Sequence, residues 1–245
     1  MRFHRLPLVL AIAIVPALVP ARAACEPPRS SLADAFRPAP APRTFVVLVD
    51  HSASVDPADR ALHLAALEAL AEALRPGDRV LAAHAGETTR ANFRPAFVRA
   101  VASDDRRLVR EANERAACLA LRRAAPTLVP AGARPARRTQ LLEAIAAAAP
   151  AFGRGPGVLV LLSDGVEESP HLDLARAPLD ATDVAAALAR ARAEGLLPRL
   201  VGVDLHVVGA GGQHYASVER FWRAYARATG ARLVAYGRLG LGPLP

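Results

Sequence analysis

The sequence predicts an α/β fold in which a doubly wound, mostly parallel sheet carries one antiparallel edge strand and has helices on both faces. Short apolar runs alternate with longer stretches of helical periodicity, as in strands joined by crossover helices. The runs 44–50 and 158–163 are almost continuously apolar, which indicates strands covered on both faces. The runs 79–85 and 96–102 are joined only by the polar segment 86–94, which indicates a hairpin. We therefore expect the strand at 96–102 to be the antiparallel edge.

The first two helices follow from capping residues and apolar spacing. Asp56 is a favourable N-cap and Pro57 suits a first helical turn. Apolar residues then recur at helical spacing over 62–74. After the hairpin, the charged, amphipathic segment 104–125 predicts a second helix, and we expect a loop over 126–138 because it is rich in Pro, Gly and Arg.

The second half of the chain continues the alternation of strands and helices. Thr139 stands just before a helix at 141–149, and Asp183 is the expected N-cap of a helix ending at Glu194. A strand at 201–208, a helix at 217–229 and a strand at 233–236 complete the domain. On the last helix, Phe221 and Tyr225 share a face that should pack on the sheet, which would leave Trp222 half exposed.

Residues 1–23 read as a signal peptide and not as fold. A basic start is followed by an apolar stretch, 6–20, and by small residues at 21 and 23, which suit a signal peptidase. The stretch is too short for an ordinary membrane span. We therefore expect an exported protein, periplasmic or secreted, with a Pro/Ala-rich linker at 24–43 and one domain at 44–240.

The two cysteines, Cys25 and Cys118, leave two alternatives open. In an oxidising compartment an even pair favours a disulfide. Alternatively, Ala23-Ala24-Cys25 could belong to a lipoprotein signal, although Arg22 stands where an apolar residue is expected. Lipidation of Cys25 is the only route to a membrane tether that the sequence suggests.

Composition argues against a nucleic-acid partner. The formal net charge is +8 at pH 7, and three of the arginines lie in the signal segment. The chain has one Trp and three Tyr, too few for the stacking platforms that hold single strands.

Oxygen-bearing side chains follow two predicted strands and precede one helix. Asp50, Ser52 and Ser54 come directly after the first strand, Asp164 follows the buried strand at 158–163, and Thr139 stands before a helix. In open α/β sheets ligands bind beyond the carboxyl ends of the strands. Oxygen donors suit a hard divalent cation such as Mg²⁺. The sequence therefore predicts a metal site at this edge.

Three segments that carry these side chains resemble motifs of the von Willebrand factor A domain family. They are Asp-His-Ser-Ala-Ser at 50–54, Arg-Arg-Thr-Gln-Leu-Leu-Glu-Ala-Ile at 137–145 and Leu-Leu-Ser-Asp-Gly-Val at 161–166. The resemblance covers about 44–237. It implies a metal-ion-dependent adhesion site for Mg²⁺, or for Mn²⁺ or Ca²⁺, whose open position accepts a carboxylate from a partner protein. The implied ligands are the hydroxyls of Ser52, Ser54 and Thr139, with Asp50 and Asp164 acting mainly through coordinated water.

The chain departs from the family pattern at two places. Arg137-Arg138 stand where the family usually has glycines, and Ser163 stands where it often has threonine. The arginines end a stretch without acidic residues between Glu114 and Glu143, which either steers an acidic ligand or is a solvated surface. The arginines of that stretch are Arg115, Arg122, Arg123, Arg134, Arg137 and Arg138.

The function that these features favour is a non-enzymatic, exported protein-binding module. One alternative is a structural component of an envelope or secretion assembly with a vestigial metal site. A metal-assisted hydrolase or phosphatase is less favoured, because Ser52 stands where an aspartate-nucleophile phosphatase needs a second acid. We expect the cluster of His171, Glu167, Glu168 and Asp173 to be a solvated loop; the alternative is a second metal site.

Overall fold

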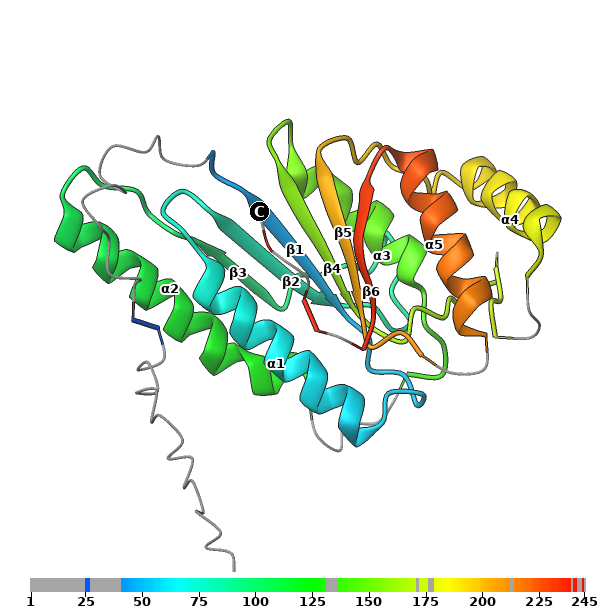
Figure 1. Ribbon diagram of the computed structural model, residues 1–245, viewed down its shortest axis with the longest axis horizontal. Helices are drawn as coiled ribbons and strands as arrows, with labels where there is room; N and C mark the ends of the chain where they lie inside the picture. Colours follow the sequence, from blue (N-terminus) through cyan, green and yellow to red (C-terminus); the bar gives the residue numbers. More distant parts are fainter. Residues whose placement is uncertain are drawn as a thin grey trace, which may run out of the picture.

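The computed structural model describes residues 25–26, 41–130, 136–170, 172–175, 179–211, 214–238, 240–241 and 244. Its centre is a six-stranded sheet made of β1 (Thr44–Val49), β2 (Arg79–His84), β3 (Phe97–Ala100), β4 (Gly157–Leu162), β5 (Val203–Val208) and β6 (Arg232–Gly237). The spatial order is β3-β2-β1-β4-β5-β6 (Figure 1). All neighbours are parallel except β2 and β3. The predicted fold class, including the antiparallel edge strand, is confirmed.

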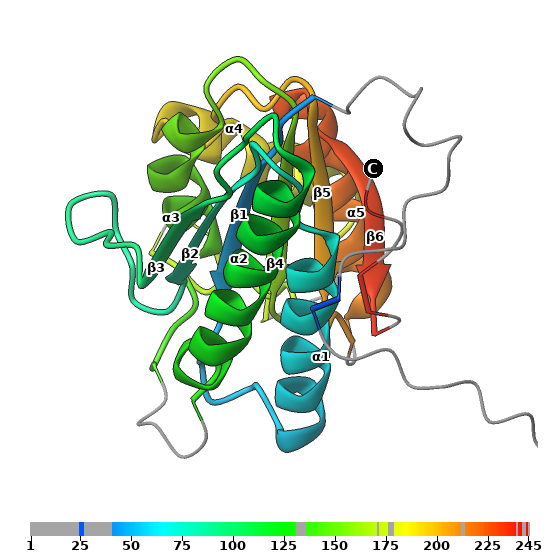
Figure 2. The same cartoon turned by 90° about the vertical axis from the view of Figure 1, so that its left-hand side faces the viewer.

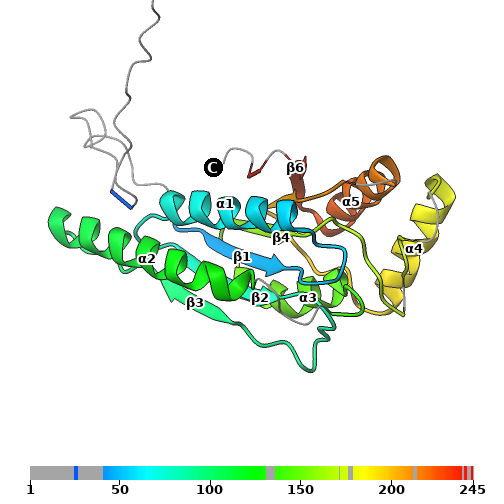
Figure 3. The same cartoon turned by 90° about the horizontal axis from the view of Figure 1, so that it is seen from below.

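Helices cover both faces of the sheet. One face carries α1 (Pro57–Ala73) and α2 (Arg107–Leu128), which lie side by side; the other carries α3 (Leu141–Ala148), α4 (Ala181–Ala193) and α5 (Tyr215–Thr229) (Figures 2 and 3). A short 3-10 helix, η2 (Ala149–Phe152), continues from α3. The sheet thus separates two apolar layers, one under each group of helices.

The central strand β1 shows how the sequence builds these layers. Val46 and Leu48 belong to the layer under α3 and α5, whereas Phe45, Val47 and Val49 belong to the layer under α1 and α2. Alternate side chains of a strand point to opposite faces, so a strand covered on both faces needs an unbroken apolar run. The last residue of that run directly precedes Asp50, which places the carboxylate at the carboxyl edge of the sheet.

Two helix boundaries differ from the sequence prediction. We expected the second helix to end before Pro126, but α2 continues to Leu128. Pro126 lies in the last turn of α2, only two residues before the helix ends, and Leu128 at that end is buried. We also expected Asp183 to cap the fourth helix. The N-cap is Asp180, whose side chain accepts hydrogen bonds from the backbone N–H groups of Thr182 and Asp183. The side chain of Asp183 accepts one from the backbone N–H of Asp180, which completes a capping box.

Trp222 was expected to be half exposed, and this was wrong. Its side chain has no exposed surface, like those of Phe221 and Tyr225. The three rings pack on one another with centroids 5.3–6.1 Å apart. Helical spacing predicts which face of α5 packs on the sheet, and Trp222 lies beside that face. The loop after β4 also packs against α5 and contacts Trp222, so a wider part of the helix is buried than the spacing predicts.

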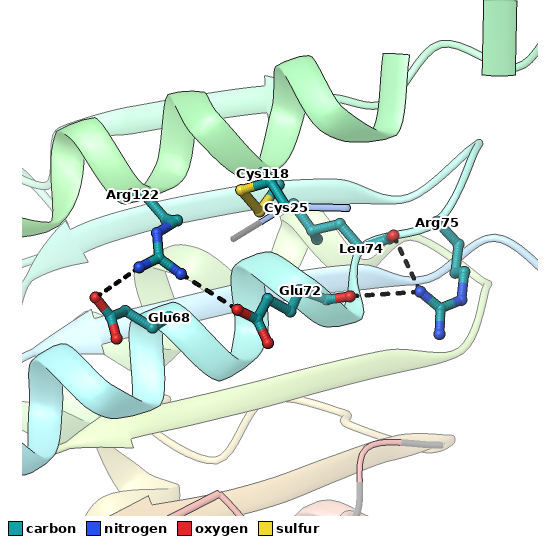
Figure 4. The surroundings of a disulfide bond; sticks show 7 residues. All are labelled: Cys25, Glu68, Glu72, Leu74, Arg75, Cys118 and Arg122. Atoms are coloured by element: carbon teal, nitrogen blue, oxygen red, sulfur yellow. Dashed lines mark hydrogen bonds and ion pairs between the residues drawn. A yellow bond between two sulfur atoms is a disulfide. The ribbon is translucent and has the colours of Figure 1, made fainter. Parts of the chain in front are cut away.

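The two cysteines are paired in a disulfide, Cys25–Cys118, on the side of α2 that faces α1, and both are buried in the apolar layer of these two helices (Figure 4). On the neighbouring turn of α2, Arg122 forms ion pairs with Glu68 and Glu72 of α1. The disulfide fits an oxidising compartment outside the cytoplasm. The disulfide occupies the sulfur atom of Cys25, so Cys25 in this state does not carry a lipid through a thioether.

The expected signal peptide, 1–23, and most of the linker, 27–40, lie outside the described residues. Within the part of the chain that the structure describes, none of the helices combines the length and the hydrophobicity needed to cross a membrane. The described elements of the domain run from Thr44 to Gly237.

Candidate metal site at the carboxyl edge of the sheet

Asp50 is the centre of the predicted site and is almost completely buried. Its Oδ1 accepts a hydrogen bond from the backbone N–H of Ser52 at 2.8 Å, and its Oδ2 accepts one from the hydroxyl of Ser163 at 2.8 Å. The hydroxyl of Thr139 lies 3.3 Å from both carboxylate oxygens. Residues from three loops, far apart in the sequence, therefore meet on one carboxylate.

The first loop follows β1 and carries the two predicted serine ligands. The hydroxyls of Ser52 and Ser54 are 2.8 Å apart. Ser52 is buried and Ser54 is exposed. The carbonyl of Ser52 accepts a bond from the N–H of Val55, and Asp56 then caps α1. The pair of hydroxyls thus leads from the buried carboxylate to the solvent.

The second loop brings Thr139 against Asp50. The N–H of Ala136 donates to the carbonyl of His51 at 3.2 Å, and Ala136 pairs with Ser52 as an isolated parallel bridge. The N–H of Gln140 donates to the carbonyls of Ala85 and Gly86 after β2. These bonds hold the segment on both sides of Thr139, whose side chain is 2% exposed.

The third loop follows β4 and carries Asp164. The hydroxyl of Ser163 donates to Asp50, lies 3.4 Å from the Oδ1 of Asp164, and accepts the N–H of Gly165. The same Oδ1 accepts the N–H of Val166 at 2.9 Å. Gly165 has φ +81°, and a Cβ there would lie 3.1 Å from the indole nitrogen of Trp222. A glycine is therefore required for this loop to lie against α5.

Glu167, in the same loop, is a residue whose role the sequence did not reveal. We expected it in a solvated loop, but its side chain has no exposed surface. Its Oε2 accepts the N–H of Leu142 at 3.0 Å, and the next residue, Glu168, donates its N–H to the carbonyl of Thr139 at 2.8 Å. Glu167 therefore caps α3 from a distant loop and fastens the third loop to the second.

A sequence signal for this cap exists in the residue that precedes α3. Gln140 stands at the N-cap, makes no side-chain cap bond, and is not one of the residue types that cap well. The neighbouring Thr139 is engaged with Asp50. The first N–H groups of a helix that begins in the protein interior without a local cap need a hydrogen-bond acceptor from another segment of the chain.

The proposed alternative of a second metal site around His171 gains no support. His171 lies outside the described residues, and Glu168 and Asp173 pair as an isolated antiparallel bridge. Among the described residues there is no group of three or more His, Cys, Asp or Glu side chains that could hold a metal ion. The candidate site at Asp50 is of a different kind, with two carboxylates and three hydroxyls.

Electrostatics make the Asp50 site suited to a cation. The pKa of Asp50 is raised to about 6: burial is the main cause, the charge of Asp164 adds to the rise, and the hydrogen bonds from Ser52 and Ser163 oppose it. In the described part of the chain, no arginine forms an ion pair with Asp50 or Asp164. Two uncompensated carboxylates beside three hydroxyl oxygens are a donor set that fits a hard divalent cation.

Comparisons with known proteins leave the family open. The strand order and the antiparallel β3 are compatible with von Willebrand factor A-like folds. No protein-family model matches the chain, and no curated protein sequence matches it.

Proposed function

We propose that this protein is an exported, non-enzymatic binding module that uses a divalent cation, Mg²⁺ or in its place Mn²⁺ or Ca²⁺, to hold an acidic side chain of a partner protein. The observation that carries the proposal is the convergence of three loops on Asp50. Ser52, Ser54 and Thr139 would bind the ion through their hydroxyls, and Asp50 and Asp164 through bound water. When bound, the ion supplies an electrophilic position that accepts a carboxylate.

The protein's own contacts prepare the site for that role. Asp50 is held by three donors, so its carboxylate is fixed in place before any ion arrives. Ser54 is exposed and Ser52 is buried, which leaves the hydroxyl side of the site open to solvent. A partner's carboxylate can therefore approach from the serine side without moving Asp50.

The same contacts support a binding function over a hydrolytic one. A nucleophilic carboxylate needs a free oxygen aimed at its substrate. Both oxygens of Asp50 accept hydrogen bonds from the protein, and the residue two positions on is Ser52, not an acid. The disulfide supports a location in the periplasm or outside the cell.

Thermal unfolding of the mature chain, first with EDTA and then with Mg²⁺, Mn²⁺ or Ca²⁺, tests the proposal. An ion that binds only the folded state adds about 2.7 kcal/mol at one hundred times its Kd. We expect this stabilisation in the wild type and in Asp105→Ala, an exposed aspartate outside the site, and not in Asp50→Ala. No stabilisation of the wild type by any of the three ions would refute the metal site. Partner capture that chelator leaves unchanged would favour a structural role instead.

A further inference from the structure

We propose that Arg137 and Arg138 form a second recognition point beside the metal site, so that the partner is a protein segment with two or more neighbouring acidic residues. One carboxylate would occupy the cation and the next would lie on the arginines. This inference rests on the proposed function and adds the chemistry of the partner to it.

The position of the two arginines is set by Thr139. Arg137 and Arg138 directly precede Thr139, whose hydroxyl lies 3.3 Å from the carboxylate of Asp50. Because successive Cα atoms are about 3.8 Å apart, the backbone of both arginines lies close to that of Thr139. Ala136, on their other side, is fastened to the carbonyl of His51 in the first loop. The backbone of the pair is therefore held between two anchored points beside the site.

The guanidinium groups of Arg137 and Arg138 are available to a ligand. Both side chains are exposed, and in the described part of the chain neither takes part in an ion pair. By contrast, Arg122 and Arg223 are paired with glutamates on helices. An unpaired guanidinium keeps all its donors for a ligand.

Two acidic residues, Glu87 and Glu168, border the pair, and in the described part of the chain neither forms an ion pair with it. Glu87 accepts the backbone N–H of Arg137 at 3.2 Å. Burial and the charges of Asp173 and Asp164 raise the pKa of Glu168, in the third loop, and the charge of Arg138 opposes this rise. Arg138 directly precedes Thr139, whose hydroxyl lies 3.3 Å from Asp50, so its backbone lies beside the expected cation position.

Guanidinium chemistry selects the partner class. Arginine offers a planar fork that matches a carboxylate with two parallel hydrogen bonds. A cation position alone accepts any single carboxylate, whereas a cation with two adjacent guanidiniums prefers a run of acids. Charge complementarity thus favours an acidic protein segment over an isolated acidic side chain.

The experiment compares two fluorescent peptides by anisotropy, one with a single glutamate among glycines and one with three consecutive glutamates, in Mg²⁺ and in EDTA. The proteins are the wild-type mature chain, R137Q/R138Q, and the control R190Q/R192Q. The control removes the same charge from two exposed arginines of α4. Mn²⁺ binding is measured separately on each protein by electron paramagnetic resonance.

We expect the wild type and the control to bind the three-glutamate peptide about tenfold more tightly than the single-glutamate peptide in Mg²⁺, because the second carboxylate gains charge-assisted bonds. R137Q/R138Q should lose that preference and keep its Mn²⁺ affinity. The inference would be overturned if R137Q/R138Q preferred the three-glutamate peptide as strongly as the wild type does. It would also be overturned if the wild type bound Mn²⁺ but neither peptide. If the wild type holds no Mn²⁺, the proposed function itself fails; peptide binding that is independent of metal but lost in R137Q/R138Q would then show an acid-binding surface without a cation.

Discussion

The indole N–H of Trp222 donates a hydrogen bond of 2.8 Å to the carbonyl oxygen of Gly165. Trp222 lies on α5, and Gly165 directly follows the predicted ligand Asp164. The chain contains a single tryptophan, and it is completely buried. Its environment is therefore tied to the position of one loop of the candidate metal site.

Tryptophan fluorescence should report cation binding directly. We expect Mg²⁺ or Mn²⁺ to change the emission of Trp222, because an ion held near Asp164 alters the field at the neighbouring Gly165 loop. The midpoint of the titration should match the Kd for Mn²⁺ from paramagnetic resonance. Asp164→Asn should bind no ion and show no change, whereas a change that persists in Asp164→Asn would place the effect elsewhere.

Glu167 should control metal affinity through the second loop. Replacing it with leucine removes the acceptor for the N–H of Leu142 and loosens the segment that holds Thr139. We expect Glu167→Leu to weaken Mn²⁺ binding about tenfold, the usual effect of losing a group that orients a ligand. Glu167→Gln keeps an oxygen acceptor and should restore affinity. The control is Glu114→Leu on α2; a comparable loss there, or no rescue by glutamine, would contradict a positioning role.

The same residue predicts how stability depends on pH. Burial raises the pKa of Glu167 from 4.5 to about 8. Between these values the folded state keeps a proton that the unfolded state has released, so this group destabilises the fold progressively as pH rises from 4.5 to 8. Denaturant unfolding in EDTA should show Glu167→Gln gaining on the wild type by roughly 3 kcal/mol between pH 5 and pH 8. A constant difference across this range would show that Glu167 does not titrate there.

Proton competition at Asp50 should weaken metal binding in mild acid. The pKa of Asp50 is about 6, and the ion requires the ionised form. The Kd for Mn²⁺ should therefore be about tenfold higher at pH 5 than at pH 7. Ser163→Ala removes a 2.8 Å hydrogen bond that favours the carboxylate, so its affinity profile should shift to higher pH. An affinity that is flat from pH 5 to pH 7 would exclude Asp50 from the site.

Reduction of the disulfide should lower stability substantially. The bond joins residues 93 positions apart, and the chain-entropy model gives about 4–5 kcal/mol for a loop of this length. For a chain of this size we expect the midpoint of thermal unfolding to fall by about 10 °C. The C25S/C118S double variant should unfold at that lower temperature and ignore reductant; a midpoint equal to the wild type's would argue against a bond in the native protein.

A buried ion pair fastens the start of β1, and breaking it should be costly. Asp78 has no exposed surface and accepts bonds from the backbone N–H and the guanidinium of Arg43, and from the N–H of Arg75. Asp78→Ala leaves a charged Arg43 largely buried, which should cost about 3–5 kcal/mol in chemical unfolding. The exposed Asp105→Ala should cost little, and a similar cost in both variants would contradict this account.

The parts of the molecule that could be predicted from sequence are those set by local pattern. The apolar run before Asp50 specifies a buried strand, and the alternation of runs specifies the parallel sheet with β3 at its edge. Asp50, Ser52, Ser54 and Asp164 are expected at one edge because parallel strands end there, whereas Thr139 as a ligand comes from the family resemblance. The structure brings these side chains close together, and their binding of a metal stays a prediction.

What escaped prediction depends on contacts between distant segments. Glu167 caps a helix that begins 26 residues before it, at Leu141, and no local spacing encodes that bond. Trp222 is buried by a loop and not by its own helix periodicity. The helix α2 continues past Pro126 to the buried Leu128, so its end depends on packing and not on the local proline signal.

The disulfide turns the first half of the domain into a covalent ring. The ring runs from Cys25 to Cys118 and contains β1, α1, β2 and β3, with Asp50, Ser52 and Ser54 among its members. Thr139 and Asp164 lie outside it. A chain delivered with its N-terminus first can close the ring before the other half of the site has arrived. The candidate metal site is thus divided between an early, cross-linked portion and a late, unlinked one, and it becomes whole only when the second portion docks.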